Sequence, residues 1–189
     1  MAQTLSGTVV RATGSWYEVL HDGSVIRCRI RGRLRLRGAR STNPVVVGDQ
    51  VVCESDAEGD WAIIDIAPRT NYVIRRASNL SKESHIIAAN VDRALLLVTL
   101  QAPTTPTEFV DRFLVTCEAY KIPVVIVLAK RDLQDDATVA EFRTVYEQAG
   151  YDVLEVSAIT GEGIGRIREL LADGTTLLSG NSGVGKSTL

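Results

Sequence analysis

The front of the chain lacks lysine. Residues 1–78 contain eleven arginines, no lysine and eight acidic residues, which gives this part a net charge of +3. Residues 79–189 have a net charge of −5, so the overall charge of −2 conceals two parts of opposite sign. Aromatic residues are also scarce, at 5% of the chain. A basic front and an acidic rear indicate two units with different partners.

Long apolar runs are absent as well. The longest runs, Ala94–Leu100 and Ile122–Ala129, are far shorter than the roughly 20 apolar residues that a membrane-spanning helix needs. The start, Met1–Thr4, has neither the basic flank nor the apolar segment of a secretory signal. We therefore expect a cytoplasmic protein with no membrane partner.

Cysteine and histidine are too few and too scattered to indicate a metal site. Cys28, Cys53 and Cys117 form no CxxC pair, and neither of the two histidines stands beside them. A structural zinc site needs about four such ligands at close spacing. We expect three reduced thiols that serve packing.

Residues 1–70 have the pattern of an all-β barrel. Val25–Arg31 alternates apolar residues with arginine, which is typical of a strand with one solvated face. His21–Gly23 has the composition of a tight turn. About five short strands without helical periodicity predict a small barrel of the OB type. Residues 71–92 are polar and irregular, and we predict a linker there.

Residues 93–189 alternate between two textures. Arg93–Thr99 and Pro123–Leu128 are runs of the kind expected for strands buried on both faces, whereas Thr107–Tyr120 and Ala137–Ala149 have helical periodicity. This alternation predicts a parallel sheet with helices on both faces. The expected apolar stripes of the two helices are Phe109, Phe113, Leu114 and Cys117, and Val139, Phe142, Val145 and Tyr146.

The most specific motif lies at the end. Residues 180–188 fit the phosphate-loop pattern G-x-x-x-x-G-K-[ST], and a predicted strand precedes them as the mechanism requires. Glycines let the backbone N–H groups surround an anion. Lys186 would supply positive charge to terminal phosphates, and the Ser187 hydroxyl would contact Mg²⁺. A chance match in a chain of this size is improbable, and the motif indicates nucleotide binding.

Two weaker motifs follow the preceding strands. Lys130-x-Asp132 occupies the place where GTP-binding proteins have Asn-Lys-x-Asp, whose Asp accepts two hydrogen bonds from guanine. Adenine lacks that donor pair, so this Asp favours guanine. Ser157-Ala158 is typical of the loop that presents a backbone N–H to the base carbonyl. Each motif is weak alone, but all three follow strand ends, where ligands bind in such sheets.

The order of these motifs identifies a family. Ordinary GTPases have the phosphate loop first, whereas here it comes last, which is a circular permutation. The chain resembles the ribosome small-subunit-dependent GTPase A family over nearly its whole length, including residues 87–92 and the Gly-Asn-Ser-Gly-Val-Gly-Lys-Ser segment. The resemblance implies an α/β P-loop GTPase domain over residues 93–189. It also implies a cytoplasmic, monomeric GTPase that uses GTP and Mg²⁺ and assists late maturation of the small ribosomal subunit.

The chain departs from the family pattern in two respects. Residue 129 is Ala where the family usually has Asn, which should weaken the base pocket. The family's threonine loop for Mg²⁺, its Asp-x-x-Gly loop and its zinc-binding C-terminal domain are expected beyond Leu189, together with the catalytic residue. We therefore expect a truncated GTPase domain with little activity of its own. The predicted GTP-binding residues are Ala129, Lys130, Arg131, Asp132, Ser157, Ala158, Gly180, Asn181, Ser182, Gly183, Val184, Gly185, Lys186, Ser187 and Thr188.

The remaining feature is a run of seven arginines without an acid in residues 27–40. Alternate arginines on a strand would form a row of phosphate-binding groups, and OB-type barrels commonly bind nucleic acid. Trp16, Tyr17 and Trp61 are the candidates for base stacking. We predict an RNA-binding barrel that contacts rRNA mainly through phosphates. Its predicted contacts are Arg27, Arg29, Arg31, Arg33, Arg35, Arg37 and Arg40.

Two other functions stay open at this point. The chain could be an RNA-binding module whose nucleotide site is vestigial, as Ala129 and the missing loops would allow. It could also be a P-loop ATPase or kinase, which Lys130-x-Asp132 opposes. The affinities for GDP and ADP would separate these functions.

Overall fold

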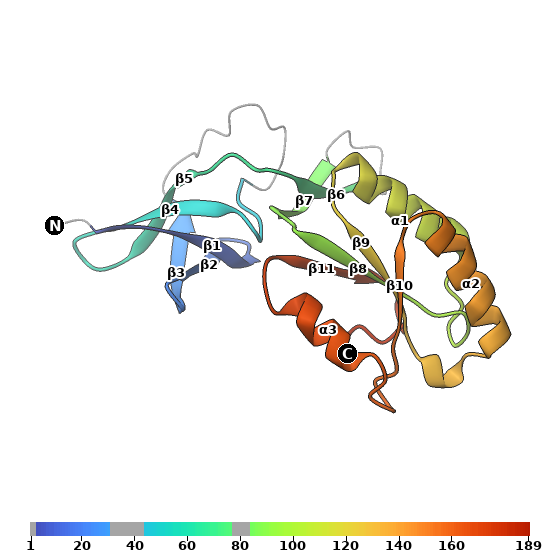
Figure 1. Cartoon of the computed structure of the whole chain (residues 1–189). Coiled ribbons are helices and arrows are strands. Elements are labelled where there is room, and N and C mark those ends of the chain that lie inside the picture. Colours follow the sequence, from blue (N-terminus) through green and yellow to red (C-terminus); the bar gives the residue numbers. More distant parts are fainter. Residues whose placement is uncertain (1–2, 31–43, 77–83) are drawn as a thin grey trace. The chain divides into compact units, whose positions relative to one another are not determined.

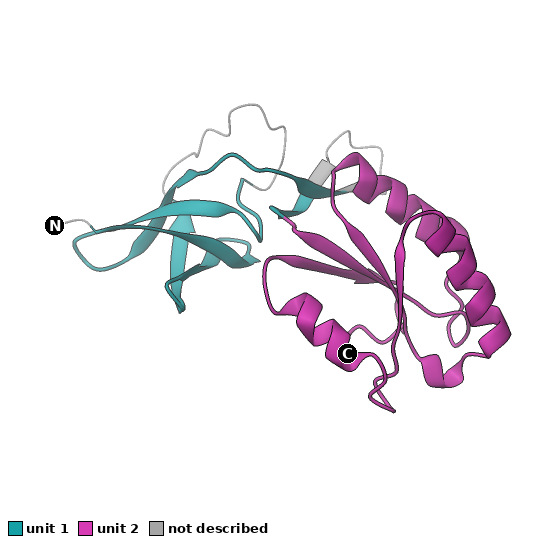
Figure 2. Cartoon of the chain, in the orientation of Figure 1, with its two compact units in different colours: residues 1–90 teal, residues 91–189 magenta. Residues whose placement is uncertain are grey.

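The computed structural model describes residues 3–30, 44–76 and 84–189. The chain divides into two units, residues 1–90 and 91–189 (Figure 2). The division falls two residues before the predicted end of the linker. Each unit has its own apolar core.

The first unit contains a closed barrel of five strands in the order β1-β2-β3-β5-β4, as the sequence predicts (Figure 1). The strands are β1 (Thr4–Thr13), β2 (Trp16–His21), β3 (Ser24–Ile30), β4 (Gln50–Ser55) and β5 (Trp61–Ile66). Alternate residues point inward and form a core that includes Val9, Val19, Cys28, Cys53 and Ile63. The barrel closes because β1 pairs with β2 through its second half and with β4 through its first. Gly7 permits this close approach, since a Cβ there would lie 2.4 Å from the Leu20 carbonyl oxygen.

The predicted irregular linker is wrong for much of its length. Residues 71–92 contain β6 (Tyr72–Arg76) and β7 (Ser84–Ala89), which pair in an antiparallel two-stranded sheet. Ile86 and Ala89 are buried against Val46, with Ile74 packed beside them. The local strand signals in this polar segment are two apolar pairs, Val73-Ile74 and Ile86-Ile87. Val73 and Ile86 are buried, whereas Ile87 is exposed, and this burial depends on contact with the rest of the first unit, which local sequence does not reveal.

A buried ion pair fixes the chain where it leaves the barrel. The carboxylate of Asp49, which is fully buried, accepts hydrogen bonds from Arg69 Nε at 2.6 Å and Nη2 at 2.7 Å. It also accepts one from the backbone N–H of Val46 at 2.8 Å. Beside it, Gly48 has a φ of 89° and approaches Ala89 so closely that a Cβ would lie 1.9 Å from its carbonyl oxygen. Glycine is therefore required at position 48.

The second unit is a parallel four-stranded sheet in the order β10-β9-β8-β11. The strands are β8 (Arg93–Val98), β9 (Val124–Leu128), β10 (Asp152–Glu155) and β11 (Thr176–Gly180). The helices are α1 (Thr107–Ala119), α2 (Asp136–Gln148) and α3 (Ile164–Leu171), and η1 (Arg131–Leu133) is a short 3-10 turn. The alternating strand and helix order confirms the predicted α/β fold.

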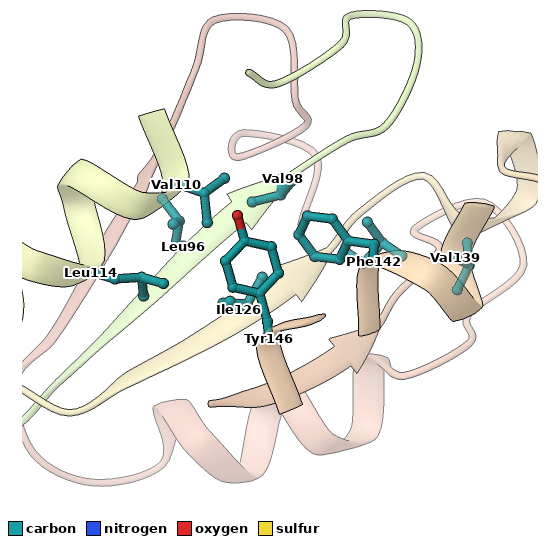
Figure 3. Close-up of a cluster of buried hydrophobic side chains, with 9 residues drawn as sticks. Leu96, Val98, Val110, Leu114, Ile126, Val139, Phe142 and Tyr146 are labelled. Carbon is teal, nitrogen blue, oxygen red and sulfur yellow. The ribbon is translucent and has the colours of Figure 1, made fainter. Parts of the chain in front are cut away.

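Helices cover both faces of this sheet, as predicted (Figure 1). Leu96 and Ile126 face the side of α1 and α2, where Phe142 and Tyr146 pack against them (Figure 3). Leu95, Leu97 and Val127 face the opposite side, where Ile167 of α3 is buried. Successive residues of a strand point to opposite faces, so a continuous apolar run supplies both cores.

The predicted helix stripes need two corrections. Val110 of α1 is fully buried, whereas the predicted Phe109 and Phe113 are only half-buried. In α2, Val145 is 56% exposed rather than part of the stripe. The period of 3.6 residues locates a buried face only within about one residue. In the part of the chain that the structure describes, no helix combines the length and the apolarity needed to cross a membrane.

Candidate functional site

The three predicted nucleotide motifs lie at one edge of the second unit's sheet. Because the four strands are parallel, their carboxyl ends meet at the same edge. Residues 129–132 follow β9 and residues 157–158 follow β10, while the loop of residues 180–188 begins at Gly180, the last residue of β11. The strands end nearly level, since Leu128 pairs with both Val98 and Glu155.

The phosphate-loop segment turns back on itself through glycines. Gly183 and Gly185 have φ values of 83° and 105°, which glycine adopts easily. A Cβ on Gly180 would lie 2.6 Å from the Leu97 carbonyl oxygen. Lys186 Nζ donates hydrogen bonds to the carbonyl oxygens of Gly180 at 2.8 Å and Asn181 at 2.7 Å. The ammonium group therefore lies across the loop that precedes it.

The side chains of the loop differ in exposure. Val184 is fully buried and anchors the loop in the apolar cluster on the α3 side of the sheet. Ser182, Gly183, Ser187 and Thr188 are exposed, and Asn181, Gly185 and Lys186 are half-buried. The segment after Gly185 is a turn, in which the N–H groups of Thr188 and Leu189 donate to the Gly185 carbonyl oxygen.

The turn that carries Asp132 is linked to the next loop by side chains. Lys130 adopts a left-handed conformation with a φ of 55°, and η1 follows it. Ser157, which is fully buried, donates from Oγ to Asp132 Oδ1 at 2.5 Å. The backbone N–H of Thr160 donates to the same Ser157 Oγ at 3.1 Å. Asp132 and Ala158 are themselves exposed to solvent.

A segment that the sequence did not single out also borders the site. Residues 99–106, after the central strand β8, are held by hydrogen bonds between Thr99 and Thr105, whose backbone N–H groups donate at 3.1 and 2.8 Å. Lys130 Nζ donates to the Ala102 carbonyl oxygen at 2.6 Å. Pro103 lies 3.5 Å from the Cβ position of Gly183. Its position after a central parallel strand was the only signal in the sequence.

The side chains of two predicted GTP-binding residues, Ala129 and Arg131, contact other parts of the protein. The Ala129 methyl is 5% exposed and packs in the cluster of Leu97, Val127, Val156 and Val184, where it can form no hydrogen bond. The Arg131 guanidinium lies among the carboxylates of Glu155 and Asp136.

Only the beginning of the arginine run can be placed. Arg31, Arg33, Arg35, Arg37 and Arg40 lie outside the described residues. Arg27 and Arg29 are exposed on β3, with their guanidinium carbons 4.3 and 4.0 Å from the centroid of the Trp16 ring. These distances are typical of cation–π contacts.

The other two candidate stacking residues belong to the barrel core. Tyr17 is buried, and this burial raises the pKa of its hydroxyl. Trp61 is half-buried against the same core. Trp16 is the one candidate of the three whose ring lies beside arginines on the outer surface. On the described barrel, the groups available to an RNA are therefore the guanidinium groups of Arg27 and Arg29 rather than an uncovered aromatic ring.

The cysteines serve packing. Cys28 and Cys53 are both buried in the barrel with sulfurs 3.6 Å apart, and Cys117 lies on the buried face of α1. Burial raises the pKa of the Cys117 thiol to about 11. Within the described ranges, no three His, Cys, Asp or Glu side chains come together as metal ligands would.

Curated relatives are similar to this chain over nearly all of its length. At 50% identity over 189 residues, the chain is similar to a protein of Bacteroides fragilis named Small ribosomal subunit biogenesis GTPase RsgA. It is also 50% identical over 191 residues to a Porphyromonas gingivalis protein of the same name. Each alignment covers 98% of this chain and 61% of the relative, so the chain spans about three fifths of the length of these relatives.

Solved structures agree with the fold. YjeQ from Thermotoga maritima is similar with a TM-score of 0.77 and 32% identity, over 98% of this chain and 63% of that one. YloQ, described as a circularly permuted GTPase, is similar with a TM-score of 0.72 and 31% identity over the same shares. Residues 6–64 match the RsgA N-terminal domain, and residues 66–189 match the RsgA GTPase domain. The chain belongs to the RsgA GTPase family.

Proposed function

We propose that the protein is a GTPase that binds the small ribosomal subunit and assists its maturation. The main support is that three loops, residues 129–132, 157–158 and 180–188, lie at the carboxyl edge of one sheet. The relatives' names describe GTPases of small-subunit biogenesis, which supports the same role here. We expect the protein to act in the cytoplasm as a monomer.

The phosphates would bind to the loop of residues 180–188. Lys186 now donates to two carbonyl oxygens of this loop, and the same ammonium group can turn to a phosphate when one is present. The positive φ values at Gly183 and Gly185 bend the backbone as an anion-binding loop requires. Val184, fully buried, would keep the loop in place.

Magnesium fits the exposed hydroxyl of Ser187. Mg²⁺ prefers oxygen ligands and is commonly held by one or two protein groups together with substrate phosphates. Ser187 follows Lys186 directly, so a nucleotide held by Lys186 would have its phosphates beside this hydroxyl. When bound, the ion would neutralise phosphate charge.

The base would lie beside Asp132. Its carboxylate is exposed and is already oriented by Ser157, so it can accept from the ring N–H and the amino group of guanine. The backbone N–H of Ala158, in the exposed loop after Ser157, is the proposed donor to the base carbonyl. The stem of Lys130 would cover the base and sugar. Ala129 would contribute only backbone and apolar contact.

The barrel is the proposed rRNA-binding part. Arg27 and Arg29 project from β3 beside Trp16, and the arginine run continues after them. Guanidinium groups bind phosphates through paired N–H donors, which suits contact with a folded RNA backbone. The net charge of +3 in residues 1–78 favours this partner.

A specific observation favours one alternative, an RNA-binding module with a weakened nucleotide site. Ala129 fills an apolar cluster where the Asn-Lys-x-Asp pattern has a hydrogen-bonding amide. This alternative predicts RNA binding without useful guanine affinity.

The test compares nucleotide binding and turnover in the full-length protein. We expect tighter binding of GDP than of ADP, and GTP hydrolysis that small ribosomal subunits stimulate. Lys186→Ala should abolish both GDP binding and GTP hydrolysis, and circular dichroism of the variant is the control for folding. Subunit binding without GDP preference or GTP turnover would support the alternative and overturn the proposal.

A further inference from the structure

The turn that carries Asp132 has no apolar anchor of its own. None of the three residues of η1 is buried, and Leu133 is 48% exposed. Ala129, just before the turn, offers a methyl group that makes apolar contacts only. A carboxylate that must meet two donors of a planar base requires fixed geometry. The position of Asp132 must therefore be set by polar contacts.

The Arg131 side chain makes most of these contacts. Its Nε donates to Glu155 Oε2 at 2.6 Å, its Nη1 donates to the Gln134 carbonyl oxygen at 3.0 Å, and its Nη2 pairs with the Asp136 carboxylate. The side chain is 18% exposed, and the hydrogen bonds that it donates to the Asp136 and Glu155 carboxylates raise its pKa. One flat guanidinium thus ties the turn to the end of β10 and to the start of α2.

Glu155 is itself held from a second side. Its Oε1 accepts a hydrogen bond from Arg143 of α2 at 2.8 Å, while Oε2 accepts from Arg131. Glu155 is the last residue of β10, and Ser157, which bonds to Asp132, follows two residues later. The backbone adds a further tie, since the Arg131 N–H donates to the Val156 carbonyl oxygen at 3.0 Å. The same two loops are therefore joined by Arg131 with Glu155 and by Asp132 with Ser157.

We infer that Arg131 is a positioning residue for guanine recognition, which fixes Asp132 by binding Glu155 and Asp136. It supplies the connection between the two base loops that the Ala129 methyl cannot make. A lysine would not reproduce it, because a single ammonium group lacks the planar fork that reaches three acceptors. The inference rests on the proposed function, since Asp132 is the proposed base contact.

The test compares the affinities for GDP and for inosine diphosphate (IDP), whose base lacks the exocyclic amino group of guanine. The ratio of the two affinities reports on the second hydrogen bond to Asp132, and a loss of general stability would not change it selectively. In the full-length protein, Arg131→Ala should lower the preference for GDP over IDP by about tenfold, the scale of one hydrogen bond to a charged group. Arg131→Lys should give an intermediate ratio.

Arg143→Ala is the matched control. It removes the other arginine from Glu155 but leaves every Arg131 contact in place, so it should lower the ratio much less than Arg131→Ala does. Thermal unfolding of each variant shows whether it is folded, and if Arg131→Ala is not, the ratio for Arg131→Lys decides.

The inference is overturned by a wild-type ratio in a folded Arg131 variant, or by an equal loss in Arg143→Ala. The proposed function fails separately. It fails if the wild-type protein binds GDP no better than ADP, in which case the inference fails with it.

Discussion

Ser157 and Asp132 are joined by a 2.5 Å hydrogen bond from Oγ to Oδ1, although 25 residues separate them in sequence. Ser157 is fully buried and Asp132 is exposed, so a fixed hydroxyl orients a carboxylate at the solvent edge. Parallel strand order brings the two together, because β9 and β10 are neighbours and end level.

Removing this hydroxyl should weaken base binding. In Ser157→Ala, Asp132 loses a donor, and we expect the free energy of GDP binding to weaken by about 1.5–3 kcal/mol, the scale of a hydrogen bond to a charged group. Isothermal titration of GDP measures the effect. Thr160→Ala is a useful comparison, since it keeps the backbone N–H that donates to Ser157. An unchanged affinity in Ser157→Ala would show that the hydroxyl does not orient the base contact.

Restoring an amide at position 129 should have two opposing effects. Ala129→Asn places a polar group in an apolar cluster, so the nucleotide-free protein should lose about 1–3 kcal/mol of unfolding free energy. The amide also recovers the Asn-Lys-x-Asp pattern, and GDP should then bind more tightly. Urea unfolding and GDP titration measure the two effects. If GDP binds no better, residue 129 does not lie at the base.

The ion pair between Asp49 and Arg69 should be essential to the first unit. Asp49→Ala leaves the mostly buried Arg69 guanidinium without its partner, and we expect a loss of about 3–5 kcal/mol in unfolding free energy. The control is Arg11→Ala, which breaks an exposed pair with Glu18 and should cost less than about 1 kcal/mol. Similar small losses for both variants would show that the buried pair is not important for stability.

Arg27 and Arg29 should contribute to RNA binding as charges. If each neutralises one phosphate, replacing both with alanine should flatten the slope of log affinity against log salt by about 1.4–1.8. Trp16→Leu removes the ring beside them but no charge, so affinity should fall while the slope stays nearly constant. Binding of small ribosomal subunits across a salt series gives both quantities. A folded double variant with the wild-type slope would leave these two arginines as solvated surface charges.

The sequence predicted the elements whose pattern is local and strong. Alternation in β3 and the apolar run of β8 located a barrel strand and a central parallel strand. The motifs at Asp132, Ser157 and Lys186 were placed at strand ends because each directly follows an apolar strand. Their common edge follows from parallel order alone.

The remaining features depend on partners distant in sequence. Arg131 belongs to the base motif by position, yet its side chain binds Glu155, 24 residues away. Residues of the strands β6 and β7 pack against Val46, and Val110 is buried by strands on either side of it in sequence. No window of the sequence around these residues contains the groups that they contact.

The central claim is that Asp132 reads a guanine base at this sheet edge. Its most direct test is to measure the affinities of the wild-type protein and of Asp132→Asn for GDP and for xanthosine diphosphate (XDP). An asparagine amide can accept from the ring N–H and donate to the second carbonyl of xanthine, which replaces the amino group of guanine. We predict that Asp132→Asn loses about 2–4 kcal/mol of GDP binding free energy and gains affinity for XDP. Unchanged affinities for both nucleotides in the folded variant would contradict the claim.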